Sequence, residues 1–185
     1  MRIIVGISGA SGVIYGWALL KYLHQTGHEV HAVVTDTGWK VLEHECGIGR
    51  RDIADYSHYL HEANNFFAPI ASGSFRADGM VVVPSTMRTL GAIANGVADN
   101  LLCRAADVMM KEQRRLIIVP RETPYNAIHL TNMLKLAQIG VTILPASPAF
   151  YHRPQTIDDL VKIMVGRICD SLGIPNDLFE RWAGV

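Results

Sequence analysis

Serine hydroxyls and glycine amides are concentrated in one short stretch near the start of the sequence. The apolar run Ile3–Ile7 breaks there into Ser8-Gly9-Ala10-Ser11-Gly12 and then resumes as a helical pattern. A strand that turns tightly into a helix presents unpaired N–H groups and the positive end of a helix dipole, which favour a phosphate. Gly6, Gly9 and Gly12 are three residues apart, unlike the G-x-G-x-x-G of dinucleotide sites. The stretch by itself fits either an anion site or a merely tight turn.

Three later apolar runs also end in small, polar or charged residues. Thr35-Asp36-Thr37 follows the second run, Ser85-Thr86 the third, and Arg121-Glu122 the fourth. In an open parallel sheet, ligands bind outside the carboxyl ends of the strands. We therefore expect these segments and the Ser8–Ser11 turn to share one crevice.

The chemistry of these strand ends suits a monophosphate better than a pyrophosphate. Hydroxyls, glycine amides and one arginine make FMN the leading candidate, with its phosphate at Ser11 or at the Ser85–Thr89 turn. NAD is the alternative, because Asp36 lies about where dinucleotide proteins place a ribose-binding acid. Thr35 before it and the glycine spacing argue against NAD.

A second group of cations is predicted on one helix. Arg104 and Lys111 are seven residues apart, which is two turns along one helical face. Together with Arg121 they would form charge-assisted bonds to a second phosphate. The same spacing also fits a solvated helix face that continues through Glu112–Arg115.

Carboxylates and hydroxyls are the candidates for proton transfer. Ser11, Glu45 and Glu122 are the residues in question, although a glutamate near a helix end, such as Glu45, is also typical of a surface. The eight histidines form no H-E-x-x-H motif, so we expect no metal site.

Composition excludes several classes of function. The formal net charge is zero and no basic stripe with interleaved aromatic residues occurs, so no nucleic-acid partner is expected. No apolar run approaches the length of a membrane span, and the chain begins directly with a strand, without room for a signal peptide. Three widely separated cysteines fit a reduced, cytoplasmic setting. Charged residues are only 18%, which fits either a covered sheet or surface hidden in an oligomer.

The elements that must position these residues alternate along the chain. Strands are predicted over 2–7, 29–35, 80–83, 116–119 and 141–144, and helices over 11–26, 38–46, 101–112, 126–139 and 156–172, with another opened by Ser85, Thr86 and Thr89. Residues 47–75 have no regular period and are expected to form a long connection. The pattern predicts one α/β domain over residues 1–185, with an open parallel sheet and helices on both faces.

Several motifs together resemble the UbiX-type flavin prenyltransferases over essentially the whole chain. The most specific are the Pro-Arg-Glu-x-Pro and Phe-Tyr-His-x-Pro-Gln segments. The matching residues are Gly6–Gly12 with Tyr15-Gly16, Ala71–Ser74, Arg104–Asp107, Lys111-Glu112, Val119–Pro124, His129-Leu130, Asn132–Leu134, Phe150–Gln155 and Arg181-Trp182.

The resemblance implies a three-layer, flavodoxin-like (Rossmann-like) fold that binds FMN. It implies transfer of a dimethylallyl group from dimethylallyl phosphate to FMN, bridging nitrogen five and carbon six of the flavin. The prenylated FMN would serve a partner UbiD-type decarboxylase. A homododecamer with active sites between subunits is also implied, which would explain the low charge content.

The resemblance also assigns roles to individual residues. FMN would be held by Gly9, Ala10, Ser11, Thr35, Thr86, Met87, Arg88, Thr89 and Arg121. The prenyl phosphate would be held by Arg104, Lys111, Arg121, Glu122, Tyr151 and Arg167. The catalytic set would be Ser11, Glu45, Lys111, Glu122, Tyr151 and Trp182.

These roles agree with elementary physical chemistry. Ser11 and Glu45 would manage protons at the flavin, and fixed cations would stabilise the departing phosphate without a metal. The rings of Tyr151 and Trp182 would stabilise a developing allylic cation.

Two positions depart from the family's pattern, and two alternatives stay open. Phe66 stands where some members have Trp, and Ser85 where many have Cys, which affects substrate preference more than chemistry. The alternatives are an FMN-dependent cysteine-type decarboxylase, which needs no prenyl-phosphate cluster, and a non-catalytic flavin carrier subunit.

Overall fold

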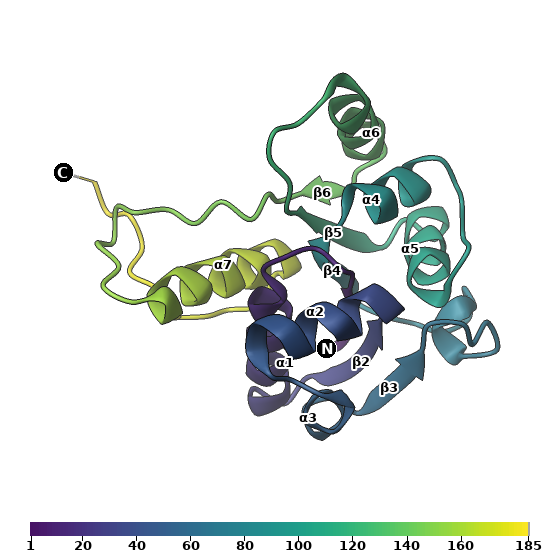
Figure 1. Cartoon of the computed structure of the whole chain (residues 1–185), viewed down its shortest axis with the longest axis horizontal. Helices are drawn as coiled ribbons and strands as arrows, with labels where there is room; N and C mark the ends of the chain where they lie inside the picture. The colour runs from purple at the N-terminus through teal and green to yellow at the C-terminus, as the bar shows by residue number, and fades with distance from the viewer. Residues whose placement is uncertain (185) are drawn as a thin grey trace.

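The structure is a computed structural model that describes residues 1–184. These residues form a parallel six-stranded sheet in the order β3-β2-β1-β4-β5-β6 (Figure 1). The strands are β1 (Arg2–Ile7), β2 (Glu29–Val34), β3 (Tyr59–Glu62), β4 (Gly79–Ser85), β5 (Arg115–Pro120) and β6 (Thr142–Ile143). The chain builds outward from β1 to β3 and then returns to β4, so the strand order reverses between β1 and β4.

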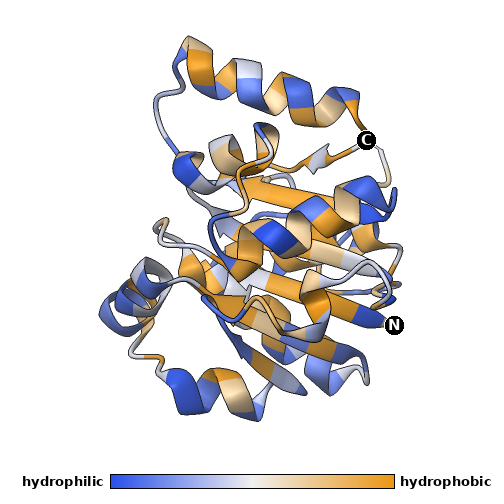
Figure 2. Cartoon of the chain, turned by 90° about the vertical axis from the view of Figure 1, so that its right-hand side faces the viewer, coloured by the Kyte–Doolittle hydropathy of each residue, from blue (hydrophilic) through white to orange (hydrophobic). Residues whose placement is uncertain are grey.

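Helices cover both faces of this sheet and give three layers. The helices are α1 (Val13–Gln25), α2 (Asp36–Cys46), α3 (Arg50–Asp55), α4 (Met87–Ala94), α5 (Leu101–Lys111), α6 (Ala127–Gln138), α7 (Ile157–Leu172) and the 3-10 turn η1 (Pro69–Ala71). One apolar core lies between the sheet and α1, α2, α3 and α7, and the second lies under α4, α5, α6 and η1. Figure 2 shows the apolar strands of the sheet lying between helices of mixed polar and apolar composition. This confirms the predicted α/β class.

Side-chain caps fix where most of the helices begin. Each cap accepts a hydrogen bond from the amide three residues on, as Thr156 does from Asp159 N at 3.2 Å. Asp159 Oδ2 accepts in return from the Thr156 and Gln155 amides, which completes a capping box at the start of α7. The same pattern occurs at Thr35, Thr86, Asn100 and Asn126.

The prediction of one irregular connection over 47–75 was wrong. This segment contains α3, the edge strand β3 and η1, and β3 pairs in parallel with β2 from His31↔Tyr59 to Val34↔Glu62. The strand has only four residues and one aliphatic side chain, Leu60, so no apolar alternation marks it in the sequence. Two smaller differences concern α1, which begins at Val13, and β6, which has only two residues.

A histidine pair holds this edge strand to its neighbour. His31 Nδ1 lies 3.0 Å from His61 Nε2, and His31 Nε2 lies 2.9 Å from Glu29 Oε1. Arg2 donates to the same Glu29 oxygen at 2.8 Å, and the His31 ring stacks on Tyr59 with centroids 4.7 Å apart. Burial, and then the neighbouring His31, lower the pKa of His61 to about 4. Burial also lowers the pKa of His31, although Glu29 opposes this, so both shifts favour the neutral form of the pair.

No helix among residues 1–184 combines the length and the apolar character that a membrane crossing requires.

Candidate active site

A cavity of about 490 Å³ opens at the carboxyl edge of the sheet, beside the point where the strand order reverses. Its walls come from the ends of β1, β2, β3 and β4 and from the start of α5. The lining residues are Ser8, Gly9, Thr35, Asp36, Thr37, Glu62, Ala63, Asn64, Thr86, Arg88, Thr89, Asp99 and Asn100. Three of the four predicted strand ends therefore share one crevice, whereas Arg121-Glu122 lies outside its lining.

Three helix N-termini converge on this cavity. Their caps, Thr35 of α2, Thr86 of α4 and Asn100 of α5, all line it. Each N-terminus carries unpaired amides and a partial positive charge, so together they favour a bound phosphate. Ser8 joins two of the strand ends: its hydroxyl donates to Pro84 O at 2.9 Å and accepts from Thr86 N at 2.8 Å.

Two glycines allow the turn after β1 to take its shape. A Cβ atom at Gly9 would lie 2.4 Å from Thr37 Cγ2 and 3.1 Å from the Thr37 carbonyl carbon, which is too close for any side chain. Gly12 has a φ of 90°, in the left-handed region that favours glycine. The turn thus packs tightly against Thr37, and its Gly9 lines the cavity.

The predicted residues Ser11, Glu45 and Arg121 meet at this turn. The Gly12 amide donates to Glu45 Oε2 at 2.9 Å, and Arg121 Nε donates to Ser11 O at 3.0 Å. Glu45 comes from the end of α2 and Arg121 follows β5, so two distant elements fix one turn. Glu122 is exposed beside them, with its carboxylate on the Thr123 amide at 3.0 Å.

Of the residues assigned to FMN, five line the cavity itself. These are Gly9, Thr35, Thr86, Arg88 and Thr89. Ala10 and Ser11 belong to the adjoining turn, which Arg121 holds, and Met87 opens α4. The cavity also has members that sequence reasoning missed: Glu62, Ala63 and Asn64 after the overlooked strand, and Asp99, which pairs with Arg88, and Asn100 before α5. An asparagine directly before the apolar Leu101-Leu102 is a typical N-cap signal, from which Asn100 could have been predicted to cap the helix at the cavity.

The two cations of α5 lie elsewhere. Arg104 donates to Ala71 O at 3.1 Å and pairs with Asp107 at 2.6 Å. Lys111 pairs with Glu112, and this contact, followed by Arg114, lowers the pKa of the Glu112 carboxyl. Because α5 starts at the cavity and its 11 residues span roughly 16 Å, Lys111 lies towards the opposite edge of the sheet. The expected convergence of Arg104, Lys111 and Arg121 does not occur within one chain.

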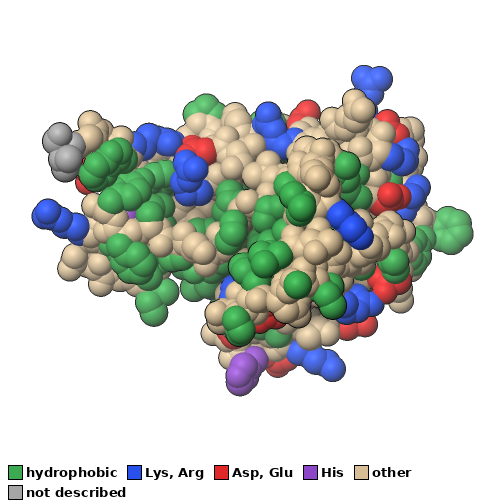
Figure 3. All heavy atoms as spheres, turned by 90° about the horizontal axis from the view of Figure 1, so that it is seen from above, with side chains coloured by type: hydrophobic (Ala, Val, Ile, Leu, Met, Phe, Trp, Pro, Cys, Tyr) green, Lys and Arg blue, Asp and Glu red, His purple; other side chains and the backbone are tan. Residues whose placement is uncertain are grey.

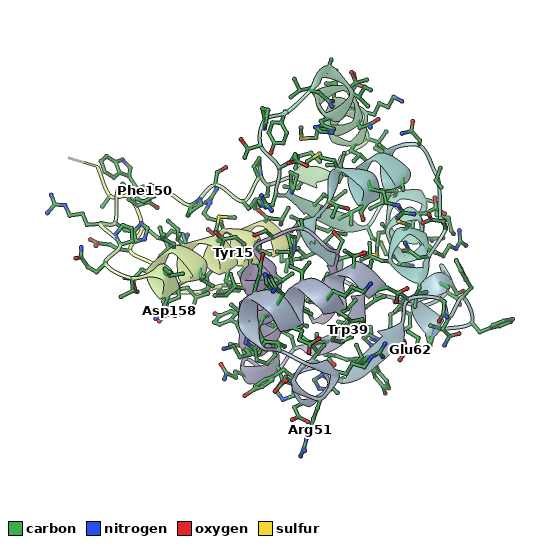
Figure 4. All side chains as sticks on the ribbon, in the orientation of Figure 1. Tyr15, Trp39, Arg51, Glu62, Phe150 and Asp158 are labelled. Carbon is green, nitrogen blue, oxygen red and sulfur yellow. The ribbon has the colours of Figure 1, made fainter. Side chains whose placement is uncertain are left out.

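A third group lies on α7 and the segments beside it, which form an arm that projects from the sheet (Figure 1). The Tyr151 and Trp182 rings meet edge to face with centroids 5.7 Å apart. Tyr151 and Arg167 also line a hollow of about 330 Å³ with residues Ser147–Ala149, Ile163 and Met164. Figure 4 places Phe150 and Asp158 of this arm on the side of the molecule away from Glu62 of the cavity.

Large apolar side chains are exposed on this arm. Phe150 is 68% exposed, Ile157 73% and Trp182 61%. Figure 3 shows hydrophobic side chains gathered on the projecting end of the molecule. A further exposed set lies on or beside α6: Tyr125, Ile128, Leu130, Leu134 and Ile139. Such patches are typical of surfaces that are covered in a protein–protein interface.

Comparison with known proteins places the chain in a family. The flavoprotein family profile matches residues 1–169. The flavin prenyltransferase UbiX of Halalkalibacterium halodurans is 50% identical, over 96% of this chain and 91% of its own length. The flavin prenyltransferase UbiX of Methanocaldococcus jannaschii is 46% identical over the full length of both chains.

Solved structures agree with these relatives. The crystal structure of AnUbiX (PadA1) in complex with FMN and dimethylallyl pyrophosphate has a TM-score of 0.97 and 42% identity, covering 100% of this chain and 98% of that one. A dodecameric FMN-dependent UbiX-like decarboxylase from Escherichia coli O157:H7 also has a TM-score of 0.97, with 44% identity and full coverage of both chains. The peptidyl-cysteine decarboxylase EpiD, at 18% identity and a TM-score of 0.61, covering 80% of this chain and 81% of its own, shares only the fold. The chain belongs to the flavoprotein family and, within it, to the UbiX-type flavin prenyltransferases.

Proposed function

We propose that the protein is a flavin prenyltransferase, which transfers the dimethylallyl group of dimethylallyl phosphate to FMN. The observation that carries this function is full-length identity of 46–50% to flavin prenyltransferases, joined to a cavity whose walls fit a flavin phosphate. The solved relative that holds both FMN and dimethylallyl pyrophosphate supports the same pair of ligands.

The cavity residues fit FMN. The threonine hydroxyls at the N-termini of α2 and α4 and the asparagine cap of α5 suit a monophosphate, and Gly9 brings the backbone of the first turn to the cavity wall. Thr35, Thr86 and Thr89 would hold the phosphate end, and the turn at Ser11, braced by Arg121, would border the flavin ring. FMN supplies the ring atoms that accept the dimethylallyl group.

The remaining residues would act on the donor. Arg104, Lys111 and Arg167 carry fixed positive charge, which stabilises a departing phosphate as its charge develops. Tyr151 and Trp182 offer ring faces to an allylic cation but few nucleophilic atoms that could trap it. Ser11 would hold or move a proton beside the flavin, and Glu45, bonded to the Gly12 amide, would keep that turn in place.

A complete site would draw on more than one copy of the chain. The FMN cavity, the α5 cations and the α7 arm are separate on a single chain, and the last carries exposed apolar side chains. Residues from neighbouring copies would bring the three groups together. The solved relative described as dodecameric supports an assembly of that size here.

The product suggests a partner and a setting. Prenylated FMN has no further role in this cavity, so it would pass to a UbiD-type decarboxylase that uses it as a cofactor. We infer a cytoplasmic protein whose residues 1–185 form one flavin-binding domain. Copurification of tagged protein with a UbiD-type enzyme, and cofactor loading of that enzyme, would test the partner.

The central experiment supplies reduced FMN and dimethylallyl phosphate to the purified protein under anaerobic conditions. Mass spectrometry of the extracted flavin should show the added five-carbon group. An unchanged FMN mass, in an assay where a UbiX relative works, would contradict the function. Dimethylallyl pyrophosphate in place of the phosphate tests donor preference.

A complementation experiment tests whether the site is shared between copies. Lys111→Ala and Arg121→Ala chains should each be nearly inactive, and co-assembly of both should restore about a quarter of the wild-type rate, because random mixing leaves about one site in four intact. Mixing each variant with itself is the control. No recovery in verified mixed oligomers would place both residues in the site of one chain.

A further inference from the structure

The chain after α7 folds back along that helix. Residues 174–182 run beside Gly166, where a Cβ atom would lie 2.5 Å from the Phe179 ring and 2.9 Å from Asn176 Oδ1. Asn176 Nδ2 bonds Gly166 O at 3.3 Å in the same place. The missing side chain at Gly166 therefore lets the returning segment approach the helix backbone.

One carboxylate ties this returning segment down. Asp170 Oδ1 accepts from Arg181 Nη2 at 2.8 Å and from Asn176 Nδ2 at 2.9 Å. Its Oδ2 accepts from Arg181 Nη1 at 3.0 Å and from Arg167 Nη1 at 3.3 Å. Arg181 is thus held by both oxygens, the geometry in which guanidinium–carboxylate pairs are strongest. The side chain of Asp170 is only 23% exposed, and chiefly because of Arg181 its pKa is lowered.

Two arginines that hydrogen-bond Asp170 connect it to residues assigned to the substrate. One of them is itself assigned to the phosphate of dimethylallyl phosphate, and the other is adjacent to a ring assigned to the allylic cation. Arg167 touches Asp170 directly. Arg181 precedes Trp182, whose ring packs edge to face on Tyr151. A guanidinium has five N–H donors, so an Arg167 that spends one on Asp170 still has donors for a phosphate. Asp170 itself lines neither the flavin cavity nor the hollow beside Tyr151.

We propose that Asp170 is a positioning residue for prenyl transfer: it orients Arg167 and, through Arg181, sets Trp182 against Tyr151. The role rests on the proposed function, because it presumes that these three residues meet the dimethylallyl donor. The negative charge is essential to it, since a neutral amide of the same shape holds a guanidinium with one oxygen and without charge assistance.

The test replaces Asp170 by asparagine and compares it with Asp158→Asn as the matched control. Asp158 lies on the same helix and pairs at 2.7 Å with Lys162, but its side chain is 68% exposed and Lys162 is not one of the residues that bond Asp170. We expect Asp170→Asn to keep wild-type affinity for FMN and to lower kcat/KM for dimethylallyl phosphate about tenfold or more, mainly through KM. The control should match the wild-type protein in both measurements.

A second readout does not depend on turnover. Trypsin should cleave after Arg181 several times faster in Asp170→Asn than in the control, because the guanidinium is no longer held on the carboxylate. Arg181→Gln attacks the same pair from an exposed position, and its kinetic defect should not add to that of Asp170→Asn in the double variant.

The outcomes separate the two hypotheses. Wild-type kinetics and tryptic resistance in Asp170→Asn would overturn the positioning role, as would a loss of FMN affinity equal to the loss of activity. Additive defects in the double variant would overturn the coupling to Arg181. A wild-type protein that forms no prenylated flavin would instead overturn the proposed function, while the tryptic comparison would still report on the Asp170–Arg181 pair.

Discussion

The flavin cavity and the residues for the dimethylallyl donor differ in how one chain builds them. The cavity is complete within the chain: strand ends and helix caps, fixed by the hydrogen-bonded sheet, supply its walls. The residues assigned to dimethylallyl phosphate are long side chains on outer elements, some on α5 and some on the α7 arm. The walls of the first region thus form when one chain folds, whereas the second region, in the proposed assembly, would form only when copies of the chain associate.

This difference explains where each region places its polar groups. Backbone amides at helix N-termini need no partner chain, because the sheet already sets their direction. Arg104, Lys111 and Arg167 instead pair on the single chain with acids one to three residues away, Asp107, Glu112 and Asp170. These local pairs hold the three cations in place on the single chain.

The largest expected effect comes from removing one donor cation. Lys111→Ala should lower prenyl transfer by about 10²–10³-fold, because a fixed charge at the leaving group is lost. Its affinity for FMN should stay unchanged, since Lys111 lies outside the cavity lining. Titration of FMN fluorescence measures the affinity, and mass analysis of the product measures prenyl transfer. A loss of FMN binding in Lys111→Ala would contradict the division of FMN and dimethylallyl phosphate between two regions.

A substitution in the cavity should act on the other property. Gly9→Ala should weaken FMN binding by about 10–100-fold, because the new methyl group would collide with Thr37 and displace the turn. Gly49→Ala is the matched control, since its Cβ would meet only Asp52 Oδ2, at 3.7 Å. Wild-type FMN affinity in Gly9→Ala, measured by the same titration, would show that this turn does not border the flavin.

Ser11 lies where the two regions meet, and its substitution sharpens the boundary. Ser11→Ala should keep FMN bound, because the contact of Arg121 with this residue is to its backbone carbonyl. Transfer should slow by about tenfold if the hydroxyl holds a proton beside the flavin. Equal losses of FMN affinity and rate, from titration and single-turnover kinetics, would assign the hydroxyl to binding alone.

The smallest effect concerns the edge strand that carries Glu62 to the cavity. The pKa of His61, about 4, lies below the ordinary value, so the unfolded chain binds more protons between pH 6.5 and 4. Stability should therefore fall as the pH drops through this window, whereas Glu29, with a pKa of about 2, stays ionised.

His61→Gln removes that titration and keeps an amide donor for His31. Thermal unfolding at pH 4.5 and 7 should show a smaller difference for this variant than for the wild-type chain. An identical difference in both proteins would assign the acid sensitivity to other groups.

Much of the fold could be predicted because its buried strands are continuous apolar runs. Met80–Val83 and Leu116–Val119 are unmistakable, and each is followed by the polar residues that a strand end at a binding edge requires. β3 escaped because an edge strand with a partly exposed surface needs no such run. Because β3 was not predicted, the cavity residues at its end, Glu62, Ala63 and Asn64, were not predicted either.

The arrangement of the donor residues could be predicted only in part. The spacing of Arg104 and Lys111 places both on one face of α5, but periodicity does not state which partner that face meets. In the structure, Arg104 contacts Asp107 and Ala71, and Lys111 contacts Glu112, all within the same chain. Contacts between copies leave no local signature in sequence beyond apolar residues, such as Ile157, at positions that a monomer would expose.

The projecting α7 arm has a consequence for how the amount of active enzyme depends on the concentration of the protein. A site divided among copies obeys the law of mass action, so its concentration falls faster than that of the protein when the solution is diluted. Flavin binding would not share this dependence. In the proposed assembly, catalytic capacity would therefore depend on association through the arm that exposes Trp182 and Phe150, whereas the yellow colour of bound flavin would count single chains.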